Sequence, residues 1–249
     1  MPKLFNRGTN KQGLIVYGGE SSADYGMVVS EAPAFERAVR KQTVINVPGR
    51  SGSIIYQDDA WEDVMRSYNV WAAADVDDLE EKVNAFEAAL NSQNGYVRLE
   101  DSFEPDFYRL AYYAGGDGFS NNMTQYGEAT INFTCRAERF YKAGEFPVAV
   151  TDGMYLANPT KFTSKPLIYI EGSGTVTVDI GGNTISAELD DYITIDCETM
   201  NAYRDNWGTI ENKNDKISGS FPQIAPGMNM VGITGTVTKV EVTPRYFTV

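Results

Sequence analysis

Short runs of alternating apolar and polar residues recur along the chain, and turn-forming glycine, proline and asparagine residues separate them. In residues 127–135, one face of the predicted strand carries Ala129, Ile131, Phe133 and Cys135. Residues 175–180 also alternate, and Gly181-Gly182-Asn183 joins them to residues 184–189, which is typical of a β-hairpin. Because strands at this spacing indicate a sandwich or barrel, the pattern predicts a mainly β fold.

One segment has the period of a helix instead. Its apolar residues recur at intervals of three and four, which places on one stripe Val76, Leu79, Val83, Phe86 and Leu90. Asp75 precedes the stripe as a predicted N-cap, and Asn94-Gly95 follows it as a predicted stop. We therefore expect a single amphipathic helix that lies on a mostly antiparallel sheet, which makes the first half of the chain α+β.

A stretch without periodicity, residues 138–165, separates two regions of different pattern. Before it, strands and the helix are mixed, whereas after it strands follow one another with turn signals between them. We therefore predict an N-terminal α+β domain over residues 1–140 and a C-terminal β-sandwich domain over residues 141–249.

A long hairpin is predicted near the start of the chain. Residues 43–47 and 53–56 are strand-like runs on either side of Pro48-Gly49-Arg50-Ser51-Gly52. Two such runs around a glycine-containing connection indicate a β-hairpin with a loop of about five residues.

The composition excludes several classes of function. The chain contains no histidine and only two cysteines, Cys135 and Cys197. Ser-His-Asp and Cys-His catalysis and the common zinc sites need more of these residues and are therefore excluded, whereas enzymes built on paired carboxylates, or on lysine and tyrosine, stay possible. We predict no cofactor and no metal site. The two cysteines are predicted to be buried free thiols.

The net charge of −13 argues against binding to a phosphate backbone or to anionic lipid, and no apolar run is long enough for a membrane span.

An acidic run leaves one enzymatic alternative open. Asp58, Asp59, Glu62 and Asp63 surround Trp61, and a glycosidase uses two carboxylates beside an aromatic platform. Acidic runs are far more often solvated surface, and spacing alone does not bring two carboxylates to the separation that catalysis needs. We therefore favour the surface interpretation.

A second alternative is sugar binding. Tyr203 and Trp207 lie among asparagine, aspartate and arginine residues, a combination with which a β-sandwich holds a sugar ring. In this interpretation the chain is a carbohydrate-binding module. The simpler interpretation is a loop tryptophan that covers the end of the sandwich, and we favour it.

The order of several motifs carries more information than any of them alone. In the first half, the residues Val47-Pro48-Gly49-Arg50-Ser51-Gly52 precede Trp61-Glu62-Asp63 and the amphipathic helix. The landmarks of the second half are residues 164–174, 192–197, 219–229 and 242–246. With these motifs in this order and spacing, nearly the whole chain resembles the distal tail protein (Dit) family of siphophages. The proteins of this family occur mostly in phages and prophages of Gram-positive hosts.

The resemblance implies a structural protein of the virion without enzymatic activity. It implies a homohexameric ring at the tail tip, assembled in the host cytoplasm, that joins the tail tube protein to the tail-associated lysin (Tal). The N-terminal domain would form the ring around a channel through which DNA passes as a passenger. The C-terminal domain would be a galectin-like β-sandwich, and the ring would be a hub for receptor-binding proteins and host attachment.

A ring protein needs surfaces that contact its neighbours. Aromatic residues are enriched in interface cores, and the hairpin together with an aromatic strand supplies them. The candidate interface residues are Val44, Arg50, Tyr56, Tyr108, Tyr112 and Tyr113. For the tyrosines, ordinary packing within the sheet is the alternative.

Overall fold

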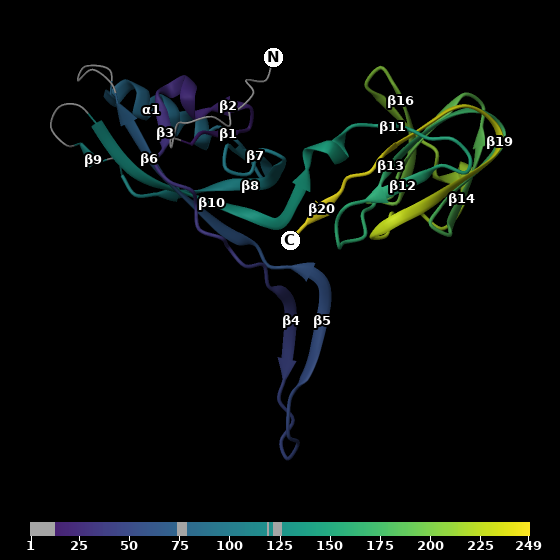
Figure 1. The fold of residues 1–249 in the computed structure, drawn as a ribbon, viewed down its shortest axis with the longest axis horizontal. Helices are drawn as coiled ribbons and strands as arrows, with labels where there is room; N and C mark the ends of the chain where they lie inside the picture. The colour runs from purple at the N-terminus through teal and green to yellow at the C-terminus, as the bar shows by residue number, and fades with distance from the viewer. Residues whose placement is uncertain (1–12, 74–78, 119, 122–125) are drawn as a thin grey trace. The chain divides into compact units, whose positions relative to one another are not determined.

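The computed structural model describes residues 13–73, 79–118, 120–121 and 126–249. The chain divides into two compact units, Met1–Arg139 with Val249 and Phe140–Thr248 (Figure 1). No helix among the described residues is long and apolar enough to cross a membrane. As the sequence predicts, the fold is mainly β, and the described residues contain one α-helix.

The first unit contains the α-helix together with short and long strands. Its strands and helices, in order, are β1 (Ile15–Tyr17), β2 (Glu20–Ser21), η1 (Ser22–Tyr25), β3 (Met27–Val29), β4 (Arg40–Ile45), β5 (Ile54–Trp61), β6 (Val64–Ala73), α1 (Leu79–Asn91), β7 (Val97–Asp101), β8 (Phe107–Gly116), β9 (Ser120–Asn121) and β10 (Tyr126–Tyr141). β4 and β5 form a two-stranded sheet of their own, as predicted for the hairpin.

The other strands of this unit form a sheet that curls around one core. The strands lie in the order β2-β1-β7-β8-β10-β6-β3, and β9 pairs with β10. Gly13, just before β1, makes an antiparallel bridge to Val29 at the end of β3, which brings the two ends of the sheet together. The predicted inward face of β10 is buried, and its Phe133 contacts Tyr17 and Tyr68 with ring centroids 4.9 and 6.0 Å apart.

The helix α1 covers this core with its predicted stripe. Leu79, Phe86 and Leu90 are buried, and Val83 packs against them. The predicted cap Asp75 and the first stripe residue, Val76, lie outside the described residues. The alternation of the strands and the period of the helix therefore direct their apolar faces to one shared core.

The second unit consists of strands and two short 3-10 helices. Its elements are η2 (Lys142–Glu145), β11 (Val148–Ala149), β12 (Tyr155–Asn158), β13 (Leu167–Ile180), β14 (Asn183–Leu189), β15 (Tyr192–Asp196), β16 (Asn201–Asn206), β17 (Thr209–Asn212), η3 (Asn214–Lys216), β18 (Ile217–Gly219), β19 (Gly227–Thr243) and β20 (Phe247–Thr248). The stretch predicted as a linker therefore contains the end of β10, η2, β11 and β12.

Two long strands fold the second sheet into two layers. Residues 175–180, which the sequence predicts as a strand, are the second half of β13, and β13 and β19 each run through as one long strand. The first half of β13 pairs with β15 and its second half with β14, while β19 follows both halves. The register shifts between Glu171 and Gly172 and again between Ser173 and Thr177, and such irregularities bend the strands that contain them. Strands that change layers through such bends enclose one core between two sheets.

The bend depends on glycines that approach the opposite backbone. Gly235 has a φ of +107°, and a Cβ there would lie 2.5 Å from the carbonyl oxygen of Thr175. We expect Gly235→Ala to lower the free energy of unfolding of this unit by about 1–3 kcal/mol, because it combines backbone strain with a clash. Urea unfolding of both variants tests this, with Gly232→Ala as the control. Gly232 lies on the same strand, and its Cβ would meet Asp179 at an ordinary 3.5 Å. Equal losses for the two variants would contradict the argument.

The two cysteines are free and buried, as predicted, with one in each unit. Burial raises the pKa of each thiol to about 12. Both therefore remain neutral at physiological pH and act as small apolar core residues rather than as nucleophiles.

Candidate oligomerisation site

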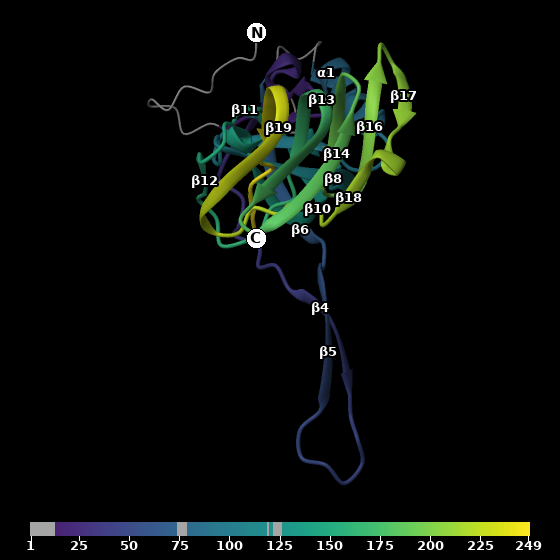
Figure 2. The same ribbon diagram turned by 90° about the vertical axis from the view of Figure 1, so that its right-hand side faces the viewer.

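The β4–β5 hairpin, residues 40–61, carries apolar side chains that its own unit does not cover. Figures 1 and 2 show it extending away from the curled sheet of its unit. Val44 and Ile55 lie opposite each other across the ladder and are 51% and 60% exposed. Tyr56, on the other face, is 64% exposed. Because neighbouring residues of a strand point to opposite faces, both faces of the hairpin are apolar.

Such a hairpin is poorly suited to stand alone in water. Two-stranded ribbons are marginally stable without further packing, and contiguous exposed apolar patches mark interaction sites. Arg50 is exposed in the connecting loop, where its amide donates to the carbonyl of Val47 over 3.2 Å. Three of the six candidate interface residues, Val44, Arg50 and Tyr56, therefore lie exposed on this one element.

The base of the hairpin is fixed to its unit. The amide of Glu62 donates to the carbonyl of Val39 over 2.8 Å, and the Arg40 guanidinium lies 4.5 Å from the centre of the Trp61 ring. Just before the hairpin, Glu36 makes a 3.2 Å ion pair with the buried Arg66. The first two contacts close the ends of the hairpin on each other, while the ion pair and the packing of Trp61 against the core connect these ends to the unit.

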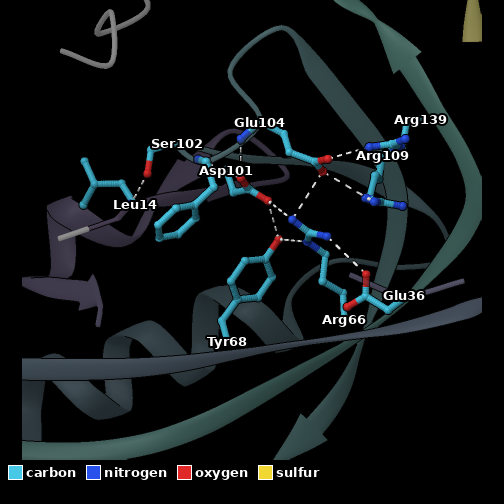
Figure 3. A network of polar contacts seen from close by, with 10 residues as sticks. Leu14, Glu36, Arg66, Tyr68, Asp101, Ser102, Glu104, Arg109 and Arg139 are labelled. Atoms are coloured by element: carbon cyan, nitrogen blue, oxygen red, sulfur yellow. Dashed lines mark hydrogen bonds and ion pairs between the residues drawn. The ribbon is translucent and has the colours of Figure 1, made fainter. Parts of the chain in front are cut away.

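Arg66 is the centre of a buried polar network (Figure 3). It lies on β6 with a side chain that is 4% exposed. Its Nε donates to the Tyr68 hydroxyl over 2.8 Å, and its Nη2 donates to Asp101 Oδ2 over 2.9 Å. The Tyr68 hydroxyl in turn donates to the same Asp101 oxygen over 2.8 Å. The other Asp101 oxygen accepts backbone amides of Phe103 and Glu104.

Glu104 extends the network to two further arginines. Its carboxylate lies 3.3 Å from Arg66 Nη2, 3.4 Å from Arg109 Nη2 and 2.6 Å from Arg139 Nη1. With Glu36 and Asp101, the three arginines face three carboxylates, so the network is neutral overall. The network, residues 36, 66, 68, 101, 104, 109 and 139, joins β6, β7, β8 and β10 to the segment before the hairpin.

The electrostatics keep these groups in their hydrogen-bonding forms. Burial by itself lowers the pKa of Arg66, but Tyr68, Asp101 and Glu104 together raise that pKa above its ordinary value. Burial, with Asp101 adding to it, raises the pKa of Tyr68 well above its usual range. Arg66 therefore stays charged, and Tyr68 stays a neutral donor.

The three candidate tyrosines of β8 have different surroundings. Tyr113 packs against the core, with its ring 5.8 Å from that of Phe133. Tyr108 and Tyr112 point to the other face of the sheet, where Arg98 lies 3.9 Å from the Tyr108 ring and Tyr96 makes an edge contact with Tyr112. Tyr112 is 39% exposed. Tyr113 is therefore a core residue, whereas Tyr108 and Tyr112 lie on the opposite face of β8.

The candidate sugar contacts lie on a hairpin of the second unit. The polar stretch that contains them forms β16 and β17, and Trp207 and Gly208 connect these strands with φ values of +53° and +91°. Positive φ at both central residues is the pattern of a type I′ turn. Trp207 is 104% exposed, so the interpretation of a tryptophan covering the sandwich is wrong. Tyr203 is half-buried on β16.

The described carboxylates of the acidic run lie exposed on the surface, and the side chain of Asp59 lies outside the described part of the chain. Asp58 is exposed on β5, while Glu62 and Asp63 lie exposed between β5 and β6. Asp63 accepts a hydrogen bond from the Tyr96 hydroxyl. Across the part of the chain that the structure describes, no group of three His, Cys, Asp or Glu residues is placed to hold a metal ion.

The sequence analysis did not find the buried network. The available signal was Arg66 at an inward position of an otherwise apolar alternation, with Val64, Tyr68 and Val70 as its neighbours on the same face. An arginine there requires carboxylates nearby, but the sequence does not say which ones.

Comparison with known proteins gives one informative result. No protein-family model and no curated protein matches the chain. Among solved structures, the chain is similar to that described as "Crystal Structure of SPP1 Dit (gp 19.1) Protein, a Paradigm of Hub Adsorption Apparatus in Gram-positive Infecting Phages". The TM-score is 0.73 at 14% sequence identity, and the match covers 95% of this chain and 99% of that one. This chain therefore has the fold of a Dit protein, which confirms the resemblance indicated by the order of its motifs.

Proposed function

We propose that this chain is a structural distal tail protein of a siphophage. In the virion, six copies form a ring at the tail tip, between the tail tube protein and Tal, and the ring is a hub for receptor-binding proteins. Its assembly takes place in the host cytoplasm. The observation that carries this proposal is the match to SPP1 Dit over almost the full length of both chains.

The exposed hairpin supports self-assembly. In a cyclic ring, each copy presents one surface to the next copy and a different surface to the previous one. The apolar hairpin supplies one such surface, and its fixed base holds it in place. The charge of −13 is compatible with DNA as a passenger, because a negative wall does not bind the phosphate backbone. The first unit is the ring-forming part in this proposal.

The native mass of the purified full-length chain tests the proposal. We expect a species six times the mass of one chain, either alone or after addition of the tail tube protein or Tal. A chain that remains a monomer alone and with both partners would refute the ring.

Sugar binding is a second candidate function, favoured by the full exposure of Trp207. We expect Trp207→Ala to abolish binding to host cell-wall glycan, because an exposed indole is the face on which a sugar ring stacks. Glycan titration followed by tryptophan fluorescence or calorimetry measures this. Ile210→Ala is the matched control, since Ile210 is 70% exposed on the same hairpin. Absence of binding by the unmodified chain at millimolar sugar would reject this candidate.

A further inference from the structure

The edge strand β12 leaves backbone groups without partners. It pairs with β19 on one side, and no other described strand pairs with it. Edge strands are normally protected by lysine, proline, a bulge or a covering element, because their free amides and carbonyls attract other strands. The sequence of β12, Tyr-Leu-Ala-Asn, contains no charge and no proline. Figure 2 shows it at the margin of its sheet beside β19.

The ladder determines which groups point outward. The Val231 amide donates to the Met154 carbonyl over 2.7 Å, and the Val231 carbonyl accepts from the Gly153 amide over 2.9 Å, so the backbone groups of Val231 face this edge strand. Hydrogen-bonded and non-bonded pairs alternate in an antiparallel ladder. The pairs Tyr155 with Met230 and Ala157 with Met228 are therefore non-bonded. The amides and carbonyls of Tyr155 and Ala157 point away from β19, and no described residue forms a hydrogen bond with them.

The outward-facing side chains beside this edge are apolar. Tyr155 is 53% exposed next to Met230 at 52%, and the exposed Ala157 lies next to Met228 at 67%. The alternate residues Leu156 and Asn158 are buried in the unit. Methionine side chains adapt to varied partners, and contiguous exposed apolar patches mark interaction sites.

We propose that β12 binds an extended segment of a partner protein as an added strand. The unpaired amides and carbonyls of Tyr155 and Ala157 recognise the backbone of that segment at the spacing of a strand. The apolar patch of Tyr155, Ala157, Met228 and Met230 selects apolar side chains at alternate positions. This is β-strand addition, in which the backbone supplies affinity and the alternate side chains supply specificity. The inference is independent of the ring.

A synthetic peptide of alternating valine and threonine, with lysine at each end, is the probe. The full-length chain is titrated with the labelled peptide by fluorescence anisotropy, and hydrogen–deuterium exchange locates the site. We expect saturable binding and slower exchange in residues 155–158. The same peptide with its central amides N-methylated has the same charge but cannot donate, and we expect it not to bind.

Ala157→Pro removes an outward amide that the β12–β19 ladder does not use, so the strand is retained. We expect it to weaken peptide binding roughly tenfold or more. Met228→Lys, which charges the apolar patch without changing the backbone, is expected to do the same. Ile210→Lys, on the exposed β17, is the control and is expected to bind like the unmodified chain.

Four results would overturn the proposal. They are the absence of binding, equal binding of the N-methylated peptide, protection located in β17 rather than β12, and binding unaffected by both Ala157→Pro and Met228→Lys. Concentration-dependent self-association that Ala157→Pro abolishes would also overturn it, because the occupant would then be a second copy of the chain.

Discussion

Val44→Asp combined with Ile55→Asp is expected to convert the assembled ring into single chains. The two side chains face each other across the hairpin and lie on the same apolar face. In a ring that buries this face, each new carboxylate loses its water without gaining a cation. Burying an unpaired charge costs several kcal/mol, which exceeds what one apolar contact supplies. Neither residue belongs to the core of its unit, so the fold itself is retained.

Native mass and thermal unfolding, measured on the same samples, separate assembly from folding. We expect the mass to fall to that of one chain while the unfolding midpoint, compared at monomer concentrations, stays unchanged. The matched control is Met200→Asp with Ile210→Asp, two apolar residues that are 64% and 70% exposed in the second unit. This control makes the same change in charge outside the β4–β5 hairpin, and we expect it to leave the mass of the assembly unchanged. Assembly of the hairpin variant, or equal loss in the control, would exclude the hairpin from the interface.

The strands whose alternation is regular could be predicted from the sequence, and those with a polar inward residue could not. Residues 127–135 alternate without exception, and they form the centre of β10. β6 was missed because Arg66 occupies an inward position, where a simple pattern expects an apolar side chain. Its burial becomes understandable only when Asp101 and Glu104, distant in sequence, supply the opposite charge.

The bent strands of the second unit show a different limit. In a sequence, the glycines at 172 and 235 cannot be told from turn residues, because turns and bent strands both favour a residue without a Cβ. Here the missing Cβ lets β13 and β19 approach each other and bend while their ladder continues. The hairpin of β4 and β5 was predicted correctly, but the exposure of its apolar side chains is a tertiary property that the local pattern does not contain.

Arg66→Met is expected to destabilise the first unit by about 3–5 kcal/mol, which is the cost of breaking a buried ion pair from one side. Methionine fills much of the same space, so the loss comes mainly from charge rather than from a cavity. Asp101, Glu36 and Glu104 would lose Arg66 as an ion-pair partner in a site that is almost closed to water, and Glu104 alone would retain Arg109 and Arg139. Tyr68 would also lose the group that donates to its hydroxyl.

Urea unfolding of Arg66→Met against Arg136→Met tests this expectation. Arg136 pairs with Glu138 at 3.2 Å on the same sheet, but its side chain is 36% exposed, and such pairs contribute about 0.2–1 kcal/mol. Adding Glu36→Gln to Arg66→Met removes one of the stranded charges. We therefore expect the double variant to be less destabilised than the sum of the two single variants. Additive losses would show that Glu36 is solvated without Arg66, and a small loss for Arg66→Met would show that the network does not hold the strands together. Since Glu36 directly precedes the hairpin, this coupling also measures how firmly the network fixes the base of the candidate interface.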